Sequence, residues 1–316
     1  MSDGGMPAKP NPLSRAVAPG AGTGRGTGLE KPPSMVLTTA CPDTTGVVAA
    51  VAGFLAANNC LITEAQHYDD PVSDTSFMRT VFHDNGQGTP ALQQLDEAFG
   101  ASVGQRFAMR WRFHEARRKC RAVLAVSKQG HCLNSMLHRW STGTLPIEVV
   151  AVVSNHQDMR SLSEWHGVPY HYLPVLDGRK AEQEQRMIDL FEKVDGELLV
   201  LARYMQILTP PACEYFAGRA INIHHSFLPG FKGARAYHQA HARGVKQIGA
   251  TAHYVTTDLD EGPIIEQEVA RVNHTMTPEE LVNIGADLES VVLNRAVKWH
   301  AERRVFVNGS KTVVLT

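Results

Sequence analysis

The alternation of apolar and polar residues predicts two folded units, at residues 34–114 and 122–316. In the first unit, alternation with a period of two predicts strands, and Leu92, Leu95 and Phe99 give one segment the apolar face of a helix. Strands are expected at residues 35–40, 61–68, 77–82 and 107–113, and helices at residues 44–58 and from residue 90. The resulting order βαββαβ predicts a ferredoxin-like sandwich.

In the second unit, short apolar runs alternate with helical patterns. Strands are expected at residues 122–127, 147–154, 170–173, 198–203 and 220–224, with helices between them, including one at residues 180–194. Repeated βα units predict an α/β fold of the Rossmann-like αβα kind, in which helices cover both faces of a mostly parallel sheet. Thr277 and Glu280 form a capping box around Pro278. A long helix is therefore expected from Pro278 to about Arg303, followed by a short tail.

Two polar segments flank the first unit. Of residues 1–33, thirteen are Gly or Pro, and large apolar side chains are nearly absent, which predicts a disordered tail. This tail lacks the amphipathic pattern of a targeting peptide. The charged stretch EARRKCR at residues 115–121 is expected to be a solvated linker.

Composition and charge narrow the function classes. With 43% hydrophobic residues the chain can bury a core, and its formal net charge of −1 gives no broad attraction to nucleic acid or to an anionic membrane. The longest apolar run, residues 47–57, is too short to span a bilayer. The five cysteines include no CxxC pair, which favours reduced thiols and a cytoplasmic location.

The chemistry is expected where strands end, because ligands in open α/β sheets gather at the carboxyl ends of strands. The strand at residues 220–224 places Asn222 and His224 on one side, since side chains alternate with a period of two. An amide can stabilise an oxyanion and an imidazole can move a proton, and together they suit acyl chemistry. Asp258 and Asp260 follow in a later acidic turn. They either serve the turn itself or place one carboxylate beside the imidazole.

These motifs resemble a known family. Asn-Ile-His-x-Ser-x-Leu-Pro from residue 222, followed by Leu-Asp-x-Gly-Pro-Ile-Ile from residue 259, resembles the 10-formyltetrahydrofolate-dependent formyltransferases over about residues 121–305. The resemblance implies that Asn222, His224 and Asp260 are catalytic. It also implies a folate pocket, formed largely by main chain, at Arg203, Met205, Gln206, Ile207, Leu208, Val255, Thr257 and Asp258. For Met205 and Ile207, simple packing in the core is an open alternative.

Within that family, two features favour hydrolysis over transfer. The segment at residues 127–137 has one glycine and makes a poor phosphate cradle, unlike that of a phosphoribosylglycinamide formyltransferase. His131-Cys132-Leu133 and Arg-Tyr-Met-Gln-Ile-Leu at residues 203–208 resemble formyltetrahydrofolate deformylases. Ser135 and Ala236 depart from the family, whose members often have Asp and Pro at these positions. The expected reaction is therefore hydrolysis of 10-formyltetrahydrofolate to formate and tetrahydrofolate. The alternatives are transfer to phosphoribosylglycinamide, or an amino-acid sensor with an inactive catalytic domain.

The first unit carries a resemblance of its own. Residues 36–46 resemble the start of an ACT domain, a module that usually binds amino acids, and deformylases carry such a domain there. The resemblance implies an amino-acid effector near Asp43, Thr45 and Gly46. It also implies pairing between chains, so a homo-oligomer is expected.

No cofactor is expected, because 10-formyltetrahydrofolate is itself the substrate and water replaces the amine acceptor. A metal site is the other interpretation of the many histidines, of which five could converge: His224, His225, His238, His241 and His253. No cysteine or carboxylate spacing matches a known ligand pattern, so the sequence predicts no metal.

Overall fold

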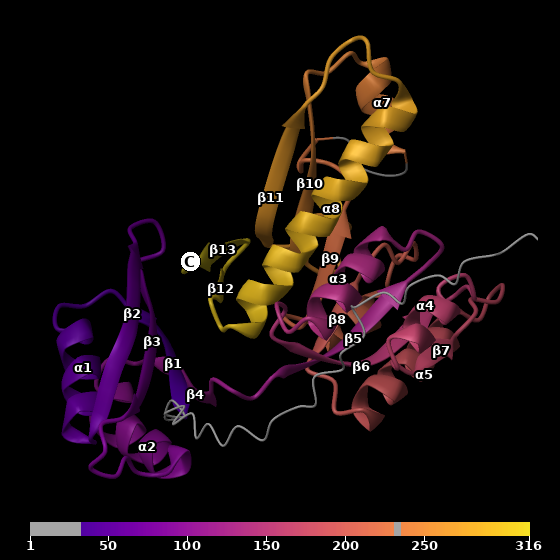
Figure 1. Cartoon of the computed structure of the whole chain (residues 1–316). Helices are drawn as coiled ribbons and strands as arrows, with labels where there is room; N and C mark the ends of the chain where they lie inside the picture. The colour runs from indigo at the N-terminus through magenta and orange to yellow at the C-terminus, as the bar shows by residue number, and fades with distance from the viewer. Residues whose placement is uncertain (1–32, 231–234) are drawn as a thin grey trace, which may run out of the picture. The chain divides into compact units, whose positions relative to one another are not determined.

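The computed structural model describes residues 33–230 and 235–316 (Figure 1). The tail expected at residues 1–33 therefore lies almost entirely outside the described residues. Two sheets with their own helices make up most of the described chain, and a short hairpin follows them.

A four-stranded antiparallel sheet with two helices forms the first part of the described chain. Its elements are β1 (Ser34–Pro42), α1 (Val47–Ala57), β2 (Cys60–Asp70), β3 (Thr75–Asp84), α2 (Leu92–Phe99) and β4 (Arg110–Glu115). The strands lie in the order β2-β3-β1-β4, and the sequence of elements is the one expected. Leu37, Val51, Phe82 and Phe99 are buried between the helices and the sheet, and this burial is what holds the layers together.

The last strand of this sheet starts later than the alternation predicted. A short π-helical turn, η1 (Gly100–Gly104), extends α2 and was not expected. Gly100 and Gly104 lie under the Trp111 ring, where an added Cβ atom would come within 2.9 and 2.6 Å of ring carbons. Phe107 is buried in the core although it precedes β4, which explains the apparent strand pattern there.

A seven-stranded sheet forms the second part, with strand order β11-β10-β9-β8-β5-β6-β7. Its strands are β5 (Cys120–Val126), β6 (Ile147–Ser154), β7 (Tyr170–Tyr172), β8 (Leu198–Leu201), β9 (Ala220–His224), β10 (Gln247–Tyr254) and β11 (Ile264–Arg271). Its helices are α3 (His131–Ser141), α4 (Arg160–Trp165), α5 (Lys180–Lys193), α6 (Pro210–Tyr215), α7 (Ala236–Ala242) and α8 (Pro278–Ala301). Strands β5 to β9 pair in parallel, and β10 is antiparallel to both of its neighbours. The expected mostly parallel α/β sheet is thus confirmed.

Helices cover both faces of this sheet, because alternate side chains of each strand point to opposite faces. Leu124 of β5 packs in a cluster with side chains of α3 and α8, whereas Val123 and Ala125 pack in another with α5 and α6. Helix α8 begins at the expected capping box, in which Thr277 Oγ1 accepts from the main-chain N–H of Glu280 at 3.2 Å.

Two expected boundaries shift. Glu115 ends β4 and Cys120 begins β5, so only residues 116–119 of the expected linker lie between strands. The short tail expected after α8 contains a hairpin that was not expected, formed by β12 (Val305–Asn308) and β13 (Lys311–Val314). Gly309 and Ser310 form the two-residue turn between Asn308 and Lys311, and Gly309 adopts the positive φ of 63° that the first position of such a turn requires.

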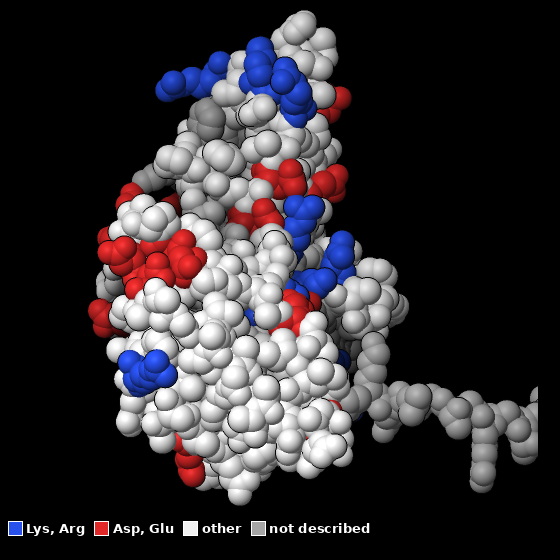
Figure 2. Space-filling view, turned by 90° about the vertical axis from the view of Figure 1, so that its left-hand side faces the viewer, with Lys and Arg blue, Asp and Glu red and all other residues white. Residues whose placement is uncertain are grey.

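On the face that Figure 2 shows, charged side chains form small groups separated by wide uncharged areas. The basic groups contain Lys and Arg, and the acidic groups contain Asp and Glu. This face offers no extended basic surface of the kind that binds nucleic acid. Among the described helices, none is both long and apolar enough to cross a membrane.

Candidate active site

A cavity of about 280 Å³ lies at the carboxyl ends of β8 and β9, beside the connection from β10 to β11. Three separate segments form its wall, at residues 201–208, 222–225 and 253–260. All eleven residues expected from the sequence line it: Asn222, His224, Asp260, Arg203, Met205, Gln206, Ile207, Leu208, Val255, Thr257 and Asp258. The fold therefore brings together the residues that the sequence motifs separated.

His224 and Asp260 form a buried ion pair at the base of this cavity. His224 Nδ1 lies 3.2 Å from Asp260 Oδ1, and its Nε2 lies 3.0 Å from Ser226 Oγ. The Ser226 hydroxyl donates to the Gly230 carbonyl at 2.7 Å, so its lone pairs face the imidazole. Contacts at both ring nitrogens therefore fix the orientation of the imidazole next to the carboxylate.

The charge of Asp260 is preserved by its neighbours. Burial alone would raise the pKa of this carboxyl, but the hydrogen bond from His224 and the electrostatic interaction with that ring outweigh burial and hold the pKa below its ordinary value. The carboxylate that reaches the imidazole is thus Asp260, as the family resemblance implied, while Asp258 is exposed at the rim.

Asn222 is oriented by His253, a residue that the sequence analysis considered only as a metal ligand. His253 Nδ1 lies 2.8 Å from the Tyr254 carbonyl, so this nitrogen donates. Burial lowers the pKa of His253, which keeps its ring neutral near pH 7 and leaves Nε2 as an acceptor. Nε2 accepts from Asn222 Nδ2 at 3.2 Å. The amide NH₂ group is therefore fixed, and its second N–H remains available to a ligand.

The turn that carries Asp260 depends on a close backbone crossing. Asp260 has a left-handed φ of 58°. A Cβ atom on Gly262 would lie 1.7 Å from the Tyr254 carbonyl oxygen, so only glycine fits there. Tyr254 N–H donates to the Pro263 carbonyl at 3.0 Å, which closes the crossing.

The expected folate segment presents apolar side chains to the cavity. Met205 is 52% exposed and Ile207 59% exposed, so the alternative that they simply pack in the core is wrong. Leu208 is buried behind them. Large exposed apolar side chains on a concave wall are typical of a surface that a ligand covers.

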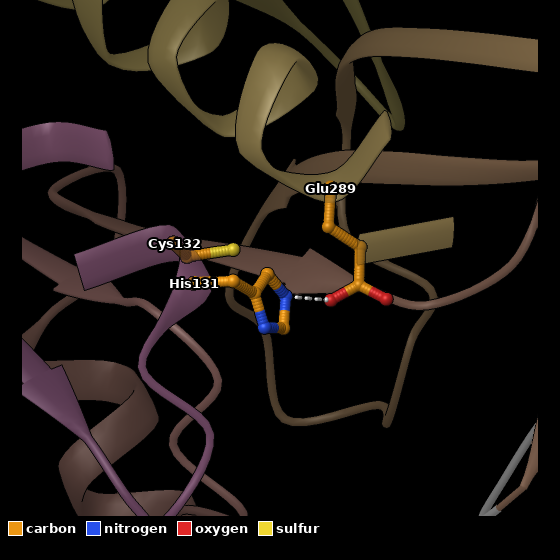
Figure 3. A group of neighbouring side chains, drawn as sticks. All are labelled: His131, Cys132 and Glu289. Carbon is orange, nitrogen blue, oxygen red and sulfur yellow. Dashed lines mark hydrogen bonds and ion pairs between the residues drawn. The ribbon is translucent and has the colours of Figure 1, made fainter. Parts of the chain in front are cut away.

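A second polar cluster, which the sequence analysis missed, surrounds Glu289 of α8. Figure 3 shows the His131 ring pointing at this carboxylate, with His131 Nε2 2.7 Å from Oε2. The Tyr237 hydroxyl donates to Oε1 at 2.9 Å, and Arg203 Nε lies 3.3 Å from Oε2. Burial would raise the pKa of Glu289, but these donors and charges hold it below its ordinary value. The sequence does contain a signal for this cluster. Glu289 lies on the apolar face of the predicted helix, and a carboxylate is rarely buried there without a partner.

This cluster includes the one group of possible metal ligands among the described residues, namely His131, Cys132 and Glu289 (Figure 3). Both Glu289 oxygens already accept from protein donors. Burial raises the pKa of the Cys132 thiol far above its usual range, whereas metal binding needs the thiolate. The residues present therefore suit a charge network better than a metal centre.

The expected effector loop also lines a cavity. Asp43, Thr45 and Gly46 border a hollow of about 590 Å³ at the start of α1, together with His67 and Asp69 of β2. Carboxylate, hydroxyl and imidazole groups are thus available there to a small polar ligand.

A buried imidazole–carboxylate pair with an oriented amide, at the carboxyl edge of a parallel sheet, defines the class as an α/β enzyme of acyl-group chemistry. A family model described as formyl transferase matches residues 120–297. The formyltetrahydrofolate deformylase of Corynebacterium sp. (strain P-1) is 47% identical over 89% of this chain and 97% of its own. The chain belongs to the formyl transferase family and, within it, to the formyltetrahydrofolate deformylases.

Solved structures give the same picture. A formyltetrahydrofolate deformylase from Burkholderia mallei has a TM-score of 0.85 and 49% identity, and the match covers 90% of this chain and all of that one. A glycinamide ribonucleotide transformylase from Symbiobacterium toebii is more distant, with a TM-score of 0.60 and 29% identity over 63% of this chain and 95% of its own.

Proposed function

We propose that this chain hydrolyses 10-formyltetrahydrofolate to formate and tetrahydrofolate. The observation that carries the proposal is the group of Asn222, His224 and Asp260, with His224 and Asp260 paired, in a cavity walled by exposed apolar side chains. Similarity over most of the chain to proteins named formyltetrahydrofolate deformylase supports the choice of substrate.

The first step is the attack of water on the formyl carbon. Asp260, ionised because its pKa is low, orients the water and takes a proton from it. The new C–O bond turns the formyl oxygen into an oxyanion. The free N–H of Asn222 and the His224 ring stabilise this oxyanion.

The second step breaks the bond between the formyl carbon and N10 of the folate. N10 leaves with the electron pair of that bond and receives the proton that Asp260 took up, directly or through His224. The products are tetrahydrofolate and formate, and the second proton of water leaves when formic acid ionises. No metal or further cofactor takes part in this proposal.

The folate itself would lie along two segments. Met205 and Ile207 would contact the pteridine ring, and the main chain of residues 255–258 would complete the pocket. Gln206, Leu208, Val255, Thr257 and Asp258 line the same cavity and belong to this proposed binding surface.

Water rather than an amine is proposed as the acceptor because of the segment after β5. This segment contains one glycine, Gly130, and an added Cβ atom there would lie 2.2 Å from Met159 Sδ. The Met159 side chain thus covers the main chain at Gly130, whereas a phosphate cradle needs exposed main-chain N–H groups. The intact catalytic group argues against an inactive enzyme that only senses amino acids.

The first part of the chain is proposed to be an ACT regulatory domain. The βαββαβ order and the polar hollow at Asp43, Thr45 and Gly46 support an amino-acid effector there. Pairing of such domains between chains would make the protein a homo-oligomer. The composition of the chain supports a cytoplasmic location for it.

The experiment that tests the function is formate release. Purified protein is incubated with 10-formyltetrahydrofolate alone, and glycinamide ribonucleotide is added later. We expect formate to appear before the addition. Turnover that starts only with the ribonucleotide would assign the chain to the transferases instead, and no turnover in either phase would favour the sensor.

A further inference from the structure

Arg203 combines a strained backbone with an incompletely paired side chain. It follows β8 with a left-handed φ of 64°, and it is only 9% exposed. Its Nε and Nη2 donate to Gln129 Oε1, and Nε also lies 3.3 Å from Glu289 Oε2. Its Nη1 is buried and meets no acceptor among the described residues. A buried donor of this kind costs free energy unless a ligand satisfies it.

Arg203 lines two adjoining cavities. The first is the candidate active site, and the second is a cavity of about 710 Å³ at the carboxyl ends of β5, β6, β8 and β9, closed on one side by α8. Both cavities are lined by Arg203, Met205 and His225. The two spaces therefore share a wall, and Arg203 is its charged member.

The second cavity is suited to an anion. Lys128, Arg203 and Arg235 line it, and Glu289 is the one carboxylate among its described lining residues. Glu289 already accepts from His131 and Tyr237, so its charge is engaged. The balance of charge in the cavity favours a small anionic ligand.

We propose that Arg203 binds formate through Nη1, and that formate leaves and water enters through the second cavity. The proposal rests on the proposed hydrolysis, in which formate is the product and folate covers the first cavity along Met205 and Ile207. When folate covers the first cavity, formate leaves past Arg203 into the second cavity. A guanidinium suits this task because its planar N–H groups match the two oxygens of a carboxylate.

Gln129 and Glu289 act on Arg203 as positioning residues. They engage Nε and Nη2, and this leaves Nη1 as the donor free for formate. A lysine at this position would keep the charge but would lose this fixed set of donors.

Formate binding is the first test. The linewidth of ¹³C-formate is followed by NMR as protein is added, and inhibition of turnover by added formate is measured in parallel. We expect the wild type to broaden the signal and to be inhibited, and Arg203→Gln to weaken both by about tenfold or more, the usual effect of losing one charged hydrogen bond. Arg295→Gln is the matched control, because Arg295 pairs with Glu268 at the surface.

The variant Arg203→Gln leaves Glu289 less well paired and could fail to fold. The double variant Arg203→Gln with Glu289→Gln removes both charges together, and circular dichroism checks its fold. If the folded double variant binds formate as the wild type does, the proposal is overturned. If the wild type turns over folate but never binds formate, the proposal is also overturned while the proposed function stands. If formate binds through Arg203 but folate is not hydrolysed, the anion site stands and the function falls.

The exit route is tested by filling the second cavity. Ala286 of α8 lines this cavity, and a tryptophan there would occupy it, whereas Asp287 beside it is exposed and lies outside the cavity. We expect Ala286→Trp to lower kcat several-fold without a matching change in KM for folate, and Asp287→Trp to leave both constants near those of the wild type. An unchanged kcat in Ala286→Trp would overturn this route.

Discussion

At the scale of single residues, Asp260 is the group on which the rest of the candidate active site depends. It lies 3.2 Å from His224 Nδ1 and 3.8 Å from His253 Nε2, and His253 in turn orients Asn222. The ion pair of Asp260 and His224 thus lies directly beside the hydrogen bond between Asn222 and His253. Removing the charge of Asp260 should affect the orientation of the imidazole and the attack of water together.

We therefore expect Asp260→Asn to lower kcat by about a hundredfold or more, the usual size of a lost acid–base group. Asp258→Asn is the matched control, since this neighbouring carboxylate is exposed and its proposed contact with folate is through main chain. The control should retain kcat and change KM at most. Formate release at saturating folate measures both variants. Equal kcat values for the two would refute the role given to Asp260.

From the residues alone the sequence predicted Asn222 and His224 on one side of a strand, and the resemblance implied Asp260 rather than Asp258. The sequence could not predict the partners of these three residues. His253 lies opposite Asn222 in the register of β9 and β10, and this pairing exists only once the sheet forms. Glu289 reaches Arg203 and His131 from a helix that starts far away in the sequence. Such contacts depend on tertiary structure, which hydrophobic periodicity does not encode.

At the scale of elements, the turn between β10 and β11 decides where Asp260 lies. Gly262 approaches the Tyr254 carbonyl so closely that no side chain fits. The helix α1 offers a contrasting glycine, Gly53, which is exposed and would place a Cβ atom in open space. Substituting alanine at each position separates the effect of the close backbone contact at Gly262 from the general effect of replacing a glycine.

Gly262→Ala should displace the turn, remove most of the turnover and lower the free energy of unfolding by about 1–3 kcal/mol. Gly53→Ala should raise the free energy of unfolding by about 0.5–1 kcal/mol, because alanine is the better helix former, and should leave turnover unchanged. Urea unfolding and the formate assay measure both effects. A fully active Gly262→Ala protein would show that the turn adapts without cost.

Element boundaries were less predictable than the elements themselves. The pattern predicted β8 as far as Arg203, whereas the strand ends at Leu201 because the backbone turns into the wall of the cavity. The hairpin after α8 was missed although Gly-Ser between two apolar runs favours one. Its strands are short, and Phe306 contacts Phe77, with ring centroids 5.5 Å apart, so long-range packing contributes to its stability.

At the scale of the whole molecule, buried neutral histidines link stability to pH. Burial and the charge of Arg203 lower the pKa of His225 to about 4, and burial with the charge of Arg303 lowers that of His300 to about 4. In the unfolded chain both rings have a pKa near 6.5. Between these values the unfolded chain binds protons that the folded protein does not, so stability falls as pH falls.

We expect the free energy of unfolding to decrease by about 1 kcal/mol for each of these two histidines between pH 7.5 and 5.5. The decrease should level off below about pH 4, where the folded protein also takes up the protons. His300→Gln should reduce the slope, because the amide can still accept from the Tyr254 hydroxyl, which lies 2.7 Å from His300 Nδ1. Urea unfolding at a series of pH values measures the slope. A slope unchanged in His300→Gln would contradict this assignment.

The exposed apolar wall at Met205 and Ile207 has a consequence for handling the protein. Without folate, these side chains face water, so the ligand-free form is the one most prone to self-association. A bound folate would cover them and, at a hundred times its Kd, would add about 2.7 kcal/mol to the stability of the folded state. Folate analogues would then act as chemical chaperones during expression and storage. In a cell, the lifetime of this enzyme would follow the supply of its own substrate.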